Sequence, residues 1–591
     1  MSIIVQKFGG TSVADSEKIL AAARKAIRAR NEGHQVVMVV SAMGKQTDRL
    51  IELARQITDD PPDREMDMLL ATGEQISVAL MAMAIHSLGH VAISLTGAQI
   101  GIITDSIHTK ARIRSISTER VRRALDAGNI VIAAGFQGTD ESGDITTLGR
   151  GGSDTTAVAL AAVLGAEACE IHTDVDGVYT TDPRIVPAAR RVERISYDEM
   201  LELATAGADV MHGRSIEFAK KFGVPIHVRS SFSDSPGTMI VREPETPGKP
   251  VCGAAMVKDE ARVTVLGLPN RHEAVTGVFS RLADKNIPLD MIVQNETANG
   301  RTDLSFTVMS ENLHATRRTI EQAVTDLGAE GLDYEENVSK ISVVGLGMAT
   351  RPGVAGMMFR ALAERDIDIQ LITTSVIKIS VAVSRDSAQD ALRAVHETFE
   401  LHLPPAVEER AATVMPTPTK PGGAELIARL QRMEKLIIEG IQLDQSQSRV
   451  AILGLPDGAG LAAKTFDRLA AAGVVVDMIV QSMGRGKRID ISITVPREQL
   501  DKTLEAASEL TAEFDCRPPK HTPKAAKLSV LGVGMKSHAG VATRIFKSLA
   551  AADIDIEMIS TSEVCVNVVV AGRDGEKALQ ILKAEFAEER I

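Results

Sequence analysis

Apolar runs alternate with longer helix-forming stretches in the first part of the chain. The strand-like runs lie at residues 3–7, 36–40, 91–95, 130–134, 168–171 and 226–229. The stretches that predict helices include 15–31, 68–88, 157–164 and 197–223, the last of them broken near 207–213. Apolar runs without strict alternation are typical of parallel strands buried on both faces. The pattern predicts an α/β fold, an open αβα sandwich with a mostly parallel sheet.

The second half of the chain repeats itself. Arg262–Pro269 matches Arg449–Pro456, and Lys340–Met348 matches Lys527–Met535. The two matches have the same offset, from position 262 to 449 and from position 340 to 527. A unit of two modules has therefore been duplicated as a whole. In the first module we expect strands at 262–268, 289–295 and 302–309 and helices at 274–285 and 312–327, the order of an α+β ferredoxin-like fold.

Changes in composition mark the expected domain boundaries. A Pro-rich stretch at 243–250 ends the first domain, and a stretch rich in Pro and Gly at 404–423 is typical of a spacer. We expect a first domain at 1–248, a linker at 404–433, and modules 1 to 4 at 249–336, 337–403, 434–523 and 524–591.

Composition narrows the class of protein. A chain of 591 residues is too long for one core. Its net charge of -12, without a basic block, argues against nucleic-acid binding. The four scattered cysteines form no CxxC pair, which fits a reducing compartment, the cytoplasm. We expect neither export nor a membrane span, because the chain starts directly with a strand and no apolar run is long enough to cross a bilayer.

One glycine-rich stretch stands at the start of an Ala-rich predicted helix. It reads Thr-Leu-Gly-Arg-Gly-Gly-Ser-Asp-Thr-Thr over residues 147–156. Its glycines let the backbone approach a ligand closely, and the helix start presents free N–H groups to an anion. Arg150 adds a two-pronged donor for a carboxylate or phosphate, and Asp154 places a negative charge in this cationic setting. The mixture favours catalysis, although a glycine turn with an ordinary cap also fits.

Further polar turns follow the predicted strands. Lys7 precedes a Gly-Gly turn, and 41–48 follows the second strand. The loop 172–184 carries several acidic side chains, a tyrosine and an arginine. Ligands of open α/β sheets bind at the carboxyl ends of the strands, so these turns are candidate ligand contacts. Each can also be a plain turn or a solvated loop, and Glu74 can merely complement a helix dipole. We expect His172 to be a packed residue.

Taken together these motifs resemble one known family. They are KFGGTSV at 7–13, SAMG at 41–44, GE at 73–74, GRGGSDT at 149–155 and TDVDGVY at 173–179. In this order they closely resemble the aspartate kinases of the amino-acid kinase superfamily, and the repeated modules resemble four ACT domains. The resemblance implies transfer of the ATP γ-phosphoryl group to the β-carboxylate of L-aspartate, giving 4-phospho-L-aspartate. Mg²⁺ would arrive with ATP, and no protein ligand for it is assigned.

The resemblance also implies roles for single residues. Lys7 and the amides of Gly9 and Gly10 would hold the phosphates, with Asp154 orienting Lys7 or the magnesium shell. The ATP site would further include Ser41, Thr173, Asp174, Tyr179 and Arg184. The aspartate site would consist of Thr47, Glu74, Arg150, Gly151, Gly152 and Ser153. An aspartate side chain has a pKa of about 3.9, so the nucleophile is already ionised and needs no general base.

For the ACT modules the resemblance implies feedback inhibition by lysine, threonine or both. The expected effector-binding residues are Asn270, Asp290, Gln294, Asp368, Thr374, Ser375, Asp457, Asp477, Gln481, Asp555, Thr561 and Ser562. Module 1 departs from the usual pattern, because Asn270 starts a turn where glycine is usual. The modules can alternatively serve only oligomerisation. A homo-oligomer is expected, most simply a dimer.

Two other functions stay open. One is a kinase of a different amino acid, and the other is a sensor that has lost catalysis, against which the intact Lys7, Glu74, Arg150 and Asp154 argue. We expect no fused homoserine dehydrogenase, because module 4 ends the sequence and no GxGxxG fingerprint follows.

Overall fold

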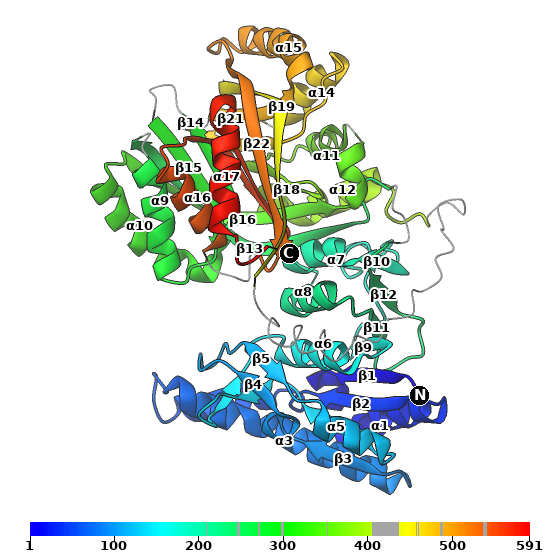
Figure 1. Cartoon of the computed structure of the whole chain (residues 1–591). Helices are drawn as coiled ribbons and strands as arrows, with labels where there is room; N and C mark the ends of the chain where they lie inside the picture. The colour runs from blue at the N-terminus through cyan, green and yellow to red at the C-terminus, as the bar shows by residue number, and fades with distance from the viewer. Residues whose placement is uncertain are drawn as a thin grey trace.

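The computed structural model places the first domain at one end of the molecule and the four modules at the other (Figure 1). It describes all residues except 209, 245–248, 270–271, 297–300, 352, 405–435, 457, 459, 485–487, 536–539 and 591. The predicted effector residues Asn270 and Asp457 and nearly all of the predicted linker therefore lie outside the described residues.

The first domain is built on an eight-stranded sheet in the order β10-β12-β11-β9-β1-β2-β6-β3. Its strands are β1 (Ile3–Phe8), β2 (Gln35–Val40), β3 (Ala92–Leu95), β6 (Ile130–Ala134), β9 (Ala168–Thr173), β10 (Arg194–Ser196), β11 (Ile226–Ser230) and β12 (Thr238–Val241). All neighbours are parallel except β11 and β12. The predicted mostly parallel sheet is confirmed.

Helices cover both faces of this sheet. Alternate residues of β2 point to opposite cores: Met38 packs with α1 (Ser16–Asn31) and α3 (Asp63–Ser87), whereas Val39 packs with α6 (Gly152–Leu164). The second face is also covered by α5 (Glu119–Asp126), α7 (Tyr197–Thr205) and α8 (Gly213–Phe222). Because both faces are buried, every strand residue from Val36 to Val40 is apolar.

The structure corrects several predicted boundaries. Helix α3 begins at Asp63, earlier than the predicted residue 68, and α6 begins at Gly152, inside the glycine-rich stretch. The sheet also continues past residues 233–237, because Gly237, at φ 78°, lets the chain return from β11 into β12. The domain also contains a small sheet in the order β5-β4-β7-β8. Its strands are β4 (Ile102–Thr104), β5 (Ile113–Ile116), β7 (Gln137–Thr139) and β8 (Ile145–Thr147).

Within the described residues, α3 is the one helix long and apolar enough to cross a bilayer, with a mean hydropathy of 1.6. More than half of its apolar window is buried inside the protein. It also carries two buried carboxylates, Asp67 and Glu74, and it packs on the sheet through Val78, Met81 and Ile85. These contacts are those of a core helix.

The four modules share one twelve-stranded sheet in the order β14-β15-β13-β16-β18-β17-β20-β21-β19-β22-β24-β23. Module 1 consists of β13 (Gly253–Pro269), α9 (His272–Asp284), β14 (Asp290–Glu296), β15 (Arg301–Met309) and α10 (Leu313–Leu327), and module 2 of β16 (Gly331–Val344), α11 (Val354–Ala363), β17 (Leu371–Thr374), β18 (Lys378–Ser384) and α12 (Ala388–Thr398). Module 3 consists of β19 (Ile437–Pro456), α14 (Leu461–Ala471), β20 (Ile479–Gly484), β21 (Arg488–Pro496) and α15 (Leu500–Glu513), and module 4 of β22 (Lys520–Val533), α16 (Val541–Ala550), β23 (Ile556–Thr561), β24 (Cys565–Ala571) and α17 (Gly575–Glu585). The order predicted for module 1 is confirmed.

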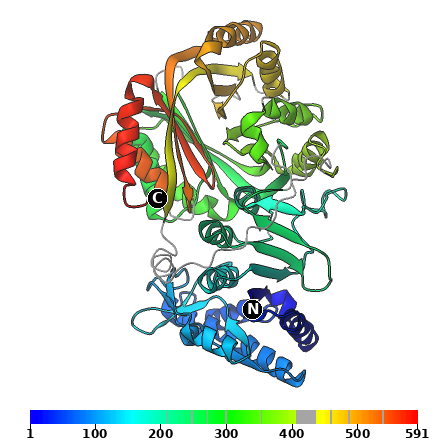
Figure 2. The same cartoon turned by 45° about the vertical axis from the view of Figure 1, so that its right-hand side comes forward.

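The modules pair across the two duplicated units and within one chain. Modules 2 and 3 meet through the antiparallel β17 and β20, and the rings of Phe359 and Phe466 lie 5.1 Å apart between their helices. Modules 1 and 4 meet through β14 and β23, with Phe279 and Phe546 at 5.2 Å (Figures 1 and 2). The two pairs therefore have separate helical cores.

A cluster on the other face of the twelve-stranded sheet shows how the repeats are related. It contains Met291, Val293, Val338, Leu371 and Ala382 from the first unit and Met478, Val480, Ala525, Met558 and Val569 from the second. Each residue of the first unit has its counterpart in the second at the offset of the sequence repeat. The two units therefore pack on the same face around an approximate two-fold axis, which explains why module 1 meets module 4 and module 2 meets module 3.

Helix α7 joins the first domain to two modules. The Glu202 carboxylate, completely buried, lies 2.7 Å from Nζ of Lys378 in module 2. It also accepts the backbone N–H of Glu563 in module 4 at 3.1 Å. Module 2 further contacts the loop after β9, where the hydroxyl of Thr180 lies 3.0 Å from Nε2 of His396. Figure 1 shows α7 and α8 between the two parts of the molecule.

Gly207 provides a test of this junction. It adopts φ 109°, and an added Cβ would lie 2.1 Å from the carbonyl oxygen of Met256 in β13. Gly33 has a similar φ of 98° with nothing within 4 Å. We predict that Gly33→Ala costs about 1–2 kcal/mol of backbone strain, and that Gly207→Ala costs about 2–5 kcal/mol because the close contact adds to it. The measurement is unfolding in urea, monitored by circular dichroism. Equal midpoints for the two variants would contradict a tight junction.

Candidate active site

The predicted ligand turns meet at the carboxyl ends of β1, β2 and β9. Since β2 and β9 lie on opposite sides of β1, the strand order changes direction there, which is the place where open α/β sheets bind ligands. The N–H of Gly9 donates to the carbonyl of His172 at 3.3 Å. On the other side the N–H of Gly44 donates to the carbonyl of Gly10 at 2.9 Å. The turns after the three strands are thus joined to one another.

Close backbone packing explains the second glycine of the first turn, Gly10. A Cβ on Gly10 would lie 2.8 Å from the carbonyl oxygen of Ala42, a distance that no real side chain tolerates. Beneath the turn, His172 is almost completely buried, and its ring stacks on Phe8 at 4.6 Å, as expected for a packed histidine. The backbone of this turn is therefore held firmly and close to the ligand side.

Lys7 and Asp154 form an ion pair in this crevice. Nζ of Lys7 lies 2.6 Å from Oδ1 of Asp154, and each side chain is 12% exposed. The two side chains therefore neutralise each other at short range. Asp154 lies in the first turn of α6, where the helix dipole favours an anion. The pair places a cation that is still partly open to solvent beside the glycine turn.

The start of α6 is shaped by residues far away in the sequence. Gly151 is its N-cap at φ 69°, and an added Cβ would lie 2.2 Å from Cβ of His212. Ser153 packs on Gly135, whose added Cβ would lie 2.6 Å from the serine hydroxyl. Arg150 is exposed and makes no hydrogen bond or ion pair with the described residues. Its guanidinium is therefore available to an anionic ligand, next to Gly152 in the first turn of the helix.

Glu74 supplies a buried anion to the wall that the turn after β2 forms. One carboxylate oxygen accepts the N–H of Ala42 at 3.0 Å, and the other is buried without a hydrogen-bond partner. Burial raises the pKa of Glu74 to about 7, and the Ala42 N–H only partly offsets this effect. A buried carboxylate with one unpaired oxygen is suited to a cationic ligand group. Ser41, after β2, and Thr47, in the first turn of α2 (Gln46–Arg55), are half-buried near this wall.

The residues predicted for the nucleotide follow β9. Thr173 ends the strand directly beyond His172, and its hydroxyl donates to the exposed Asp174 at 3.2 Å. Tyr179 donates to Asp176 at 2.9 Å, and burial together with this carboxylate raises the pKa of the phenol. The exposed Arg184 is paired with Asp182 at 2.8 Å. The structure thus brings Thr173 and Asp174 to the glycine turn, whereas Tyr179 and Arg184 are engaged within their own loop.

The acidic side chains near the site limit how the predicted Mg²⁺ can be bound. Among the described residues, no three His, Cys, Asp or Glu side chains converge in a way that could hold a metal ion. Mg²⁺ that travels with nucleotide phosphates needs only one or two carboxylates and keeps several waters. Asp154, whose Oδ1 is paired with Lys7, provides one such carboxylate.

Two residues that support the site escaped the sequence analysis. Arg214 on α8 donates to the carbonyl of Leu148 at 2.7 Å, directly before the Arg150 loop. Asp67 is completely buried on α3 and accepts the N–H of Thr109. A signal for Asp67 existed, because it is a carboxylate in an apolar stretch two helical turns before Glu74, on the same helix face.

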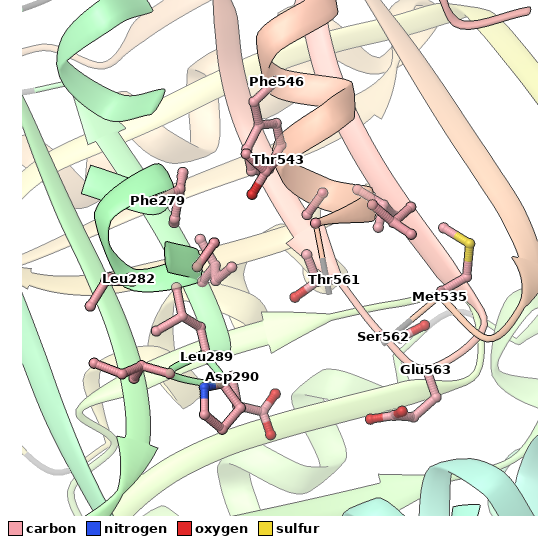
Figure 3. Close-up of a pocket in the computed structure, with 18 of the residues that line it drawn as sticks. Phe279, Leu282, Leu289, Asp290, Met535, Thr543, Phe546, Thr561, Ser562 and Glu563 are labelled. Atoms are coloured by element: carbon pink, nitrogen blue, oxygen red, sulfur yellow. The ribbon is translucent and has the colours of Figure 1, made fainter. Parts of the chain in front are cut away.

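The predicted effector residues assemble in pairs that cross the duplicated units. Asp290 from module 1 and Thr561 and Ser562 from module 4 line one cavity of about 220 Å³ (Figure 3). The side-chain amide of Gln294 donates to Ile556 across this interface at 3.1 Å. Gln481 does the same toward Ile369 between modules 3 and 2 at 2.8 Å.

The remaining effector residues occupy different settings. Thr374 accepts the N–H of Ile479 at 2.8 Å between modules 2 and 3, and the hydroxyl of the neighbouring Ser375 is buried without a hydrogen-bond partner. Asp290 and Asp477 are ion-paired with Lys340 and Lys527, the same contact at equivalent positions of the two units. Asp368 and Asp555 are exposed.

Family comparisons agree with this architecture. The amino acid kinase family matches residues 2–230, and the ACT domain matches 341–399, 450–510 and 528–586. Module 1 lies outside these matches but has the same order of strands and helices. Fold and crevice together define an amino acid kinase joined to ACT modules.

Individual relatives identify the family more closely. The aspartokinase of Bacillus sp. strain MGA3 is 50% identical over 402 residues, which is 68% of this chain and 98% of the relative. The crystal structure of aspartate kinase from Synechocystis matches 99% of this chain and 98% of its own, with 38% identity and a TM-score of 0.52. E. coli aspartokinase III, solved with aspartate and ADP, matches 67% of this chain and 99% of its own, with 25% identity and a TM-score of 0.58. The chain belongs to the aspartate kinases and is an ATP-dependent enzyme.

The raised pKa of Glu74 predicts how stability depends on pH. Between its ordinary value of 4.5 and about 7, folded Glu74 holds a proton that the unfolded chain releases. This contribution to stability is therefore lost as the pH rises through this window. We predict that the thermal unfolding midpoint of Glu74→Gln, measured from pH 5 to 8, increases relative to that of the wild type as the pH rises.

Glu119→Gln serves as the control for this experiment, because it removes an exposed carboxylate that is paired with Arg123 on the surface. Its difference from the wild type should stay flat over the same pH range. A flat difference for Glu74→Gln as well would contradict the buried, raised-pKa carboxylate.

Proposed function

We propose that the crevice transfers the γ-phosphoryl group of ATP to the β-carboxylate of L-aspartate, giving 4-phospho-L-aspartate and ADP with Mg²⁺. The observation that carries this proposal is the meeting of Lys7, Asp154 and Glu74 with the free N-terminus of α6 in one crevice. A lysine, a helix N-terminus and a buried carboxylate that can pair with an ammonium group are what a reaction between two anions, one of them an amino acid, requires.

The aspartate would bind between Arg150 and Glu74. The Arg150 guanidinium has no protein partner among the described residues, so it and the amides of Gly151 and Ser153 are available for the α-carboxylate. Gly152 would lie beside it, with its own N–H donated to the carbonyl of Gly149 at 3.0 Å. The ammonium group would pair with Glu74, whose second oxygen is unpaired. Such a pairing favours the ionised form of Glu74. Thr47 would complete the substrate side.

ATP would bind across the glycine turn. The amide of Gly10 and the Lys7 ammonium would hold its phosphates at the Gly9-Gly10 turn, where Gly10 leaves no room for a side chain and the N–H of Gly9 already donates to His172. Ser41, Thr173 and Asp174 would line the same side, and Tyr179 and Arg184 would reach the nucleotide from their loop. Mg²⁺ bound to the phosphates would neutralise their charge, with Asp154 oriented toward its shell.

The chemistry then requires little covalent help from the protein. An oxygen of the β-carboxylate attacks the γ-phosphorus, the bond from this phosphorus to the bridging oxygen breaks, and ADP leaves with the electron pair. The carboxylate is ionised at neutral pH, so no proton has to be removed. Lys7 stabilises the charge on the transferring group, and Asp154 holds Lys7 in place. E. coli aspartokinase III, which binds aspartate and ADP, has the same fold.

We predict that Lys7→Ala lowers kcat at least about 100-fold while aspartate binding is kept, because a charge that stabilises the transition state is lost. The measurement is ADP release with aspartate, glutamate and N-acetylglutamate side by side. Lys18→Ala, which removes an exposed lysine paired with Asp15, should retain wild-type rates. Full activity of Lys7→Ala would overturn its role, and turnover only with another acceptor would indicate a different amino-acid kinase.

We further propose inhibition by lysine and threonine bound between paired modules, with lysine between modules 1 and 4. The cavity there carries the carboxylates of Asp290, which is ion-paired with Lys340, and Glu563 at one end, and its described lining residues include no lysine or arginine (Figure 3). The first turn of α16 also lines it, so backbone N–H groups are available for a carboxylate. Two anionic side chains and a helix start suit a cationic amino acid.

A chain of contacts leads from this cavity toward the aspartate site. Glu563 lines the cavity, and its N–H donates to Glu202 on α7. Helix α8 follows α7, and its N-cap His212 packs against Gly151 beside Arg150. Differential binding to two arrangements of this junction would need about 1–3 kcal/mol of coupling to inhibit the enzyme.

We predict that Asp290→Asn weakens lysine binding at least about tenfold, because a charge-assisted contact becomes a neutral one. The measurement is titration calorimetry together with activity at increasing lysine, threonine and both. Asp477→Asn is the matched control, since it removes the same ion pair at the equivalent position of the second unit, between modules 2 and 3. Activity that stays constant at millimolar lysine plus threonine would refute the regulation.

Other assignments stay proposals that rest on the family resemblance. We propose the functional division at 1–248, 249–336, 337–403, 404–433, 434–523 and 524–591, with the first part catalytic. We also propose a homodimer in the cytoplasm that starts the synthesis of lysine, threonine, methionine and isoleucine. The four cysteines, all free thiols, support a reducing compartment.

A further inference from the structure

Asp67 is a buried carboxylate on α3 whose contacts all lie outside its own helix. Its side chain has no exposed surface. Both oxygens accept the N–H of Thr109, at 3.1 and 3.0 Å, and Oδ2 also lies 2.8 Å from Nδ1 of His108. The hydroxyl of Thr147 donates to Oδ1. A single carboxylate thus ties two segments, 108–109 and the end of β8, to the helix that carries Glu74.

Thr109 is held in an unusual backbone conformation. Its φ is 64°, in the left-handed region, which a β-branched residue rarely adopts. Such strain persists only where the surroundings over-determine it, and it is concentrated at functional sites. The Asp67 carboxylate, which binds the N–H of this residue with both oxygens, is the group that holds it.

The strained residue supports the loop that carries Arg150. The carbonyl oxygen of Thr109 lies so close to Gly149, at φ 75°, that an added Cβ there would be 3.0 Å away. The N–H of Ala111 donates to the carbonyl of Thr147 at 2.9 Å, which continues the contact. Residues 147–149 therefore rest on the segment that Asp67 fixes.

Arg214 holds the same loop from α8. Its guanidinium donates to the carbonyls of Leu148 at 2.7 Å and Ala111 at 2.8 Å. The two segments are thus bound to each other by Arg214 and to α3 by Asp67. Because α3 also carries Glu74, one rigid helix sets the spacing between the two walls of the crevice.

We propose that Asp67 is a positioning residue for the substrate: it fixes the Thr109 backbone and thereby the place of Arg150 opposite Glu74. The inference rests on the proposed function, in which Arg150 binds the α-carboxylate of aspartate. Asp67 touches neither substrate nor nucleotide in this scheme. Its effect is therefore specific to the affinity for aspartate and leaves the ATP side unchanged.

The test is the split between the two Michaelis constants in Asp67→Asn. The asparagine fills the same volume but loses one acceptor oxygen and the charge, so Thr109 is no longer held firmly. KM for aspartate should rise about tenfold or more, because small misplacements of a binding group are costly, while KM for ATP stays within about twofold. Asp126→Asn, which removes an exposed carboxylate whose one hydrogen bond among the described residues comes from Gln35, should change neither.

A second substitution separates positioning from general stability. Glycine adopts the left-handed conformation of residue 109 without strain, so Thr109→Gly in the Asp67→Asn background should restore most of the affinity for aspartate. Thr147→Val, which removes one of the hydrogen bonds, should raise KM for aspartate in the same sense but less. If Asp67→Asn folds poorly, Thr147→Val still tests the positioning role of Asp67.

Equal increases in both Michaelis constants, or no rescue by Thr109→Gly, would overturn the inference. Arg150→Ala distinguishes a failure of the proposed substrate contact from a failure of the positioning role of Asp67. If it leaves KM for aspartate unchanged, the proposed role of Arg150 fails. If it raises KM for aspartate and Asp67→Asn does not, the substrate assignment stands and only the positioning role of Asp67 is wrong.

Discussion

Electrostatic repulsion between two anionic reactants is the constraint on which the first domain depends. A carboxylate and a nucleoside triphosphate approach each other only where fixed positive charge outweighs their repulsion. The chain as a whole, with a net charge of -12, provides no such field. In the proposed scheme local groups do so instead: Lys7, Arg150, the N-terminus of α6 and the Gly10 amide at the carboxyl ends of the strands. Close backbone packing fixes the glycine turn and the start of α6, so little reorganisation of this backbone is left for the reaction.

Buried carboxylates place these groups relative to one another. Glu74 and Asp67 extend from one face of α3, the first toward the ligand side and the second toward the loop before Arg150. Glu202 has the same character at the junction with the modules, where it binds Lys378 and the backbone of Glu563. An unpaired buried charge costs free energy, so each of these carboxylates keeps its hydrogen-bond and ion-pair partners in place. The same property that gives the junction its geometry makes it sensitive to changes in the modules.

The duplicated half forms a structure that two separate chains would otherwise have to build. Its two units pack through equivalent residues such as Met291 and Met478, and each pair of modules draws one member from each unit. The two interfaces nevertheless differ. Strands β17 and β20 form a hydrogen-bonded ladder, whereas β14 and β23 end the twelve-stranded sheet and border a cavity. The two interfaces of this approximately symmetric framework are therefore different, so they can bind different ligands selectively.

The sequence by itself determined the features that depend on neighbours along the chain. Apolar runs such as 36–40 predicted buried strands, the glycine turns predicted close backbone approach, and the constant offset between matching segments revealed the duplication. It also named Lys7, Glu74, Arg150 and Asp154 as candidates. Only the tertiary structure decided that module 1 pairs with module 4, that β4 and β5 form a second small sheet, and that Asp67 holds Thr109. These features depend on contacts between residues far apart in the chain, where burial and distance, and not local pattern, decide which groups meet.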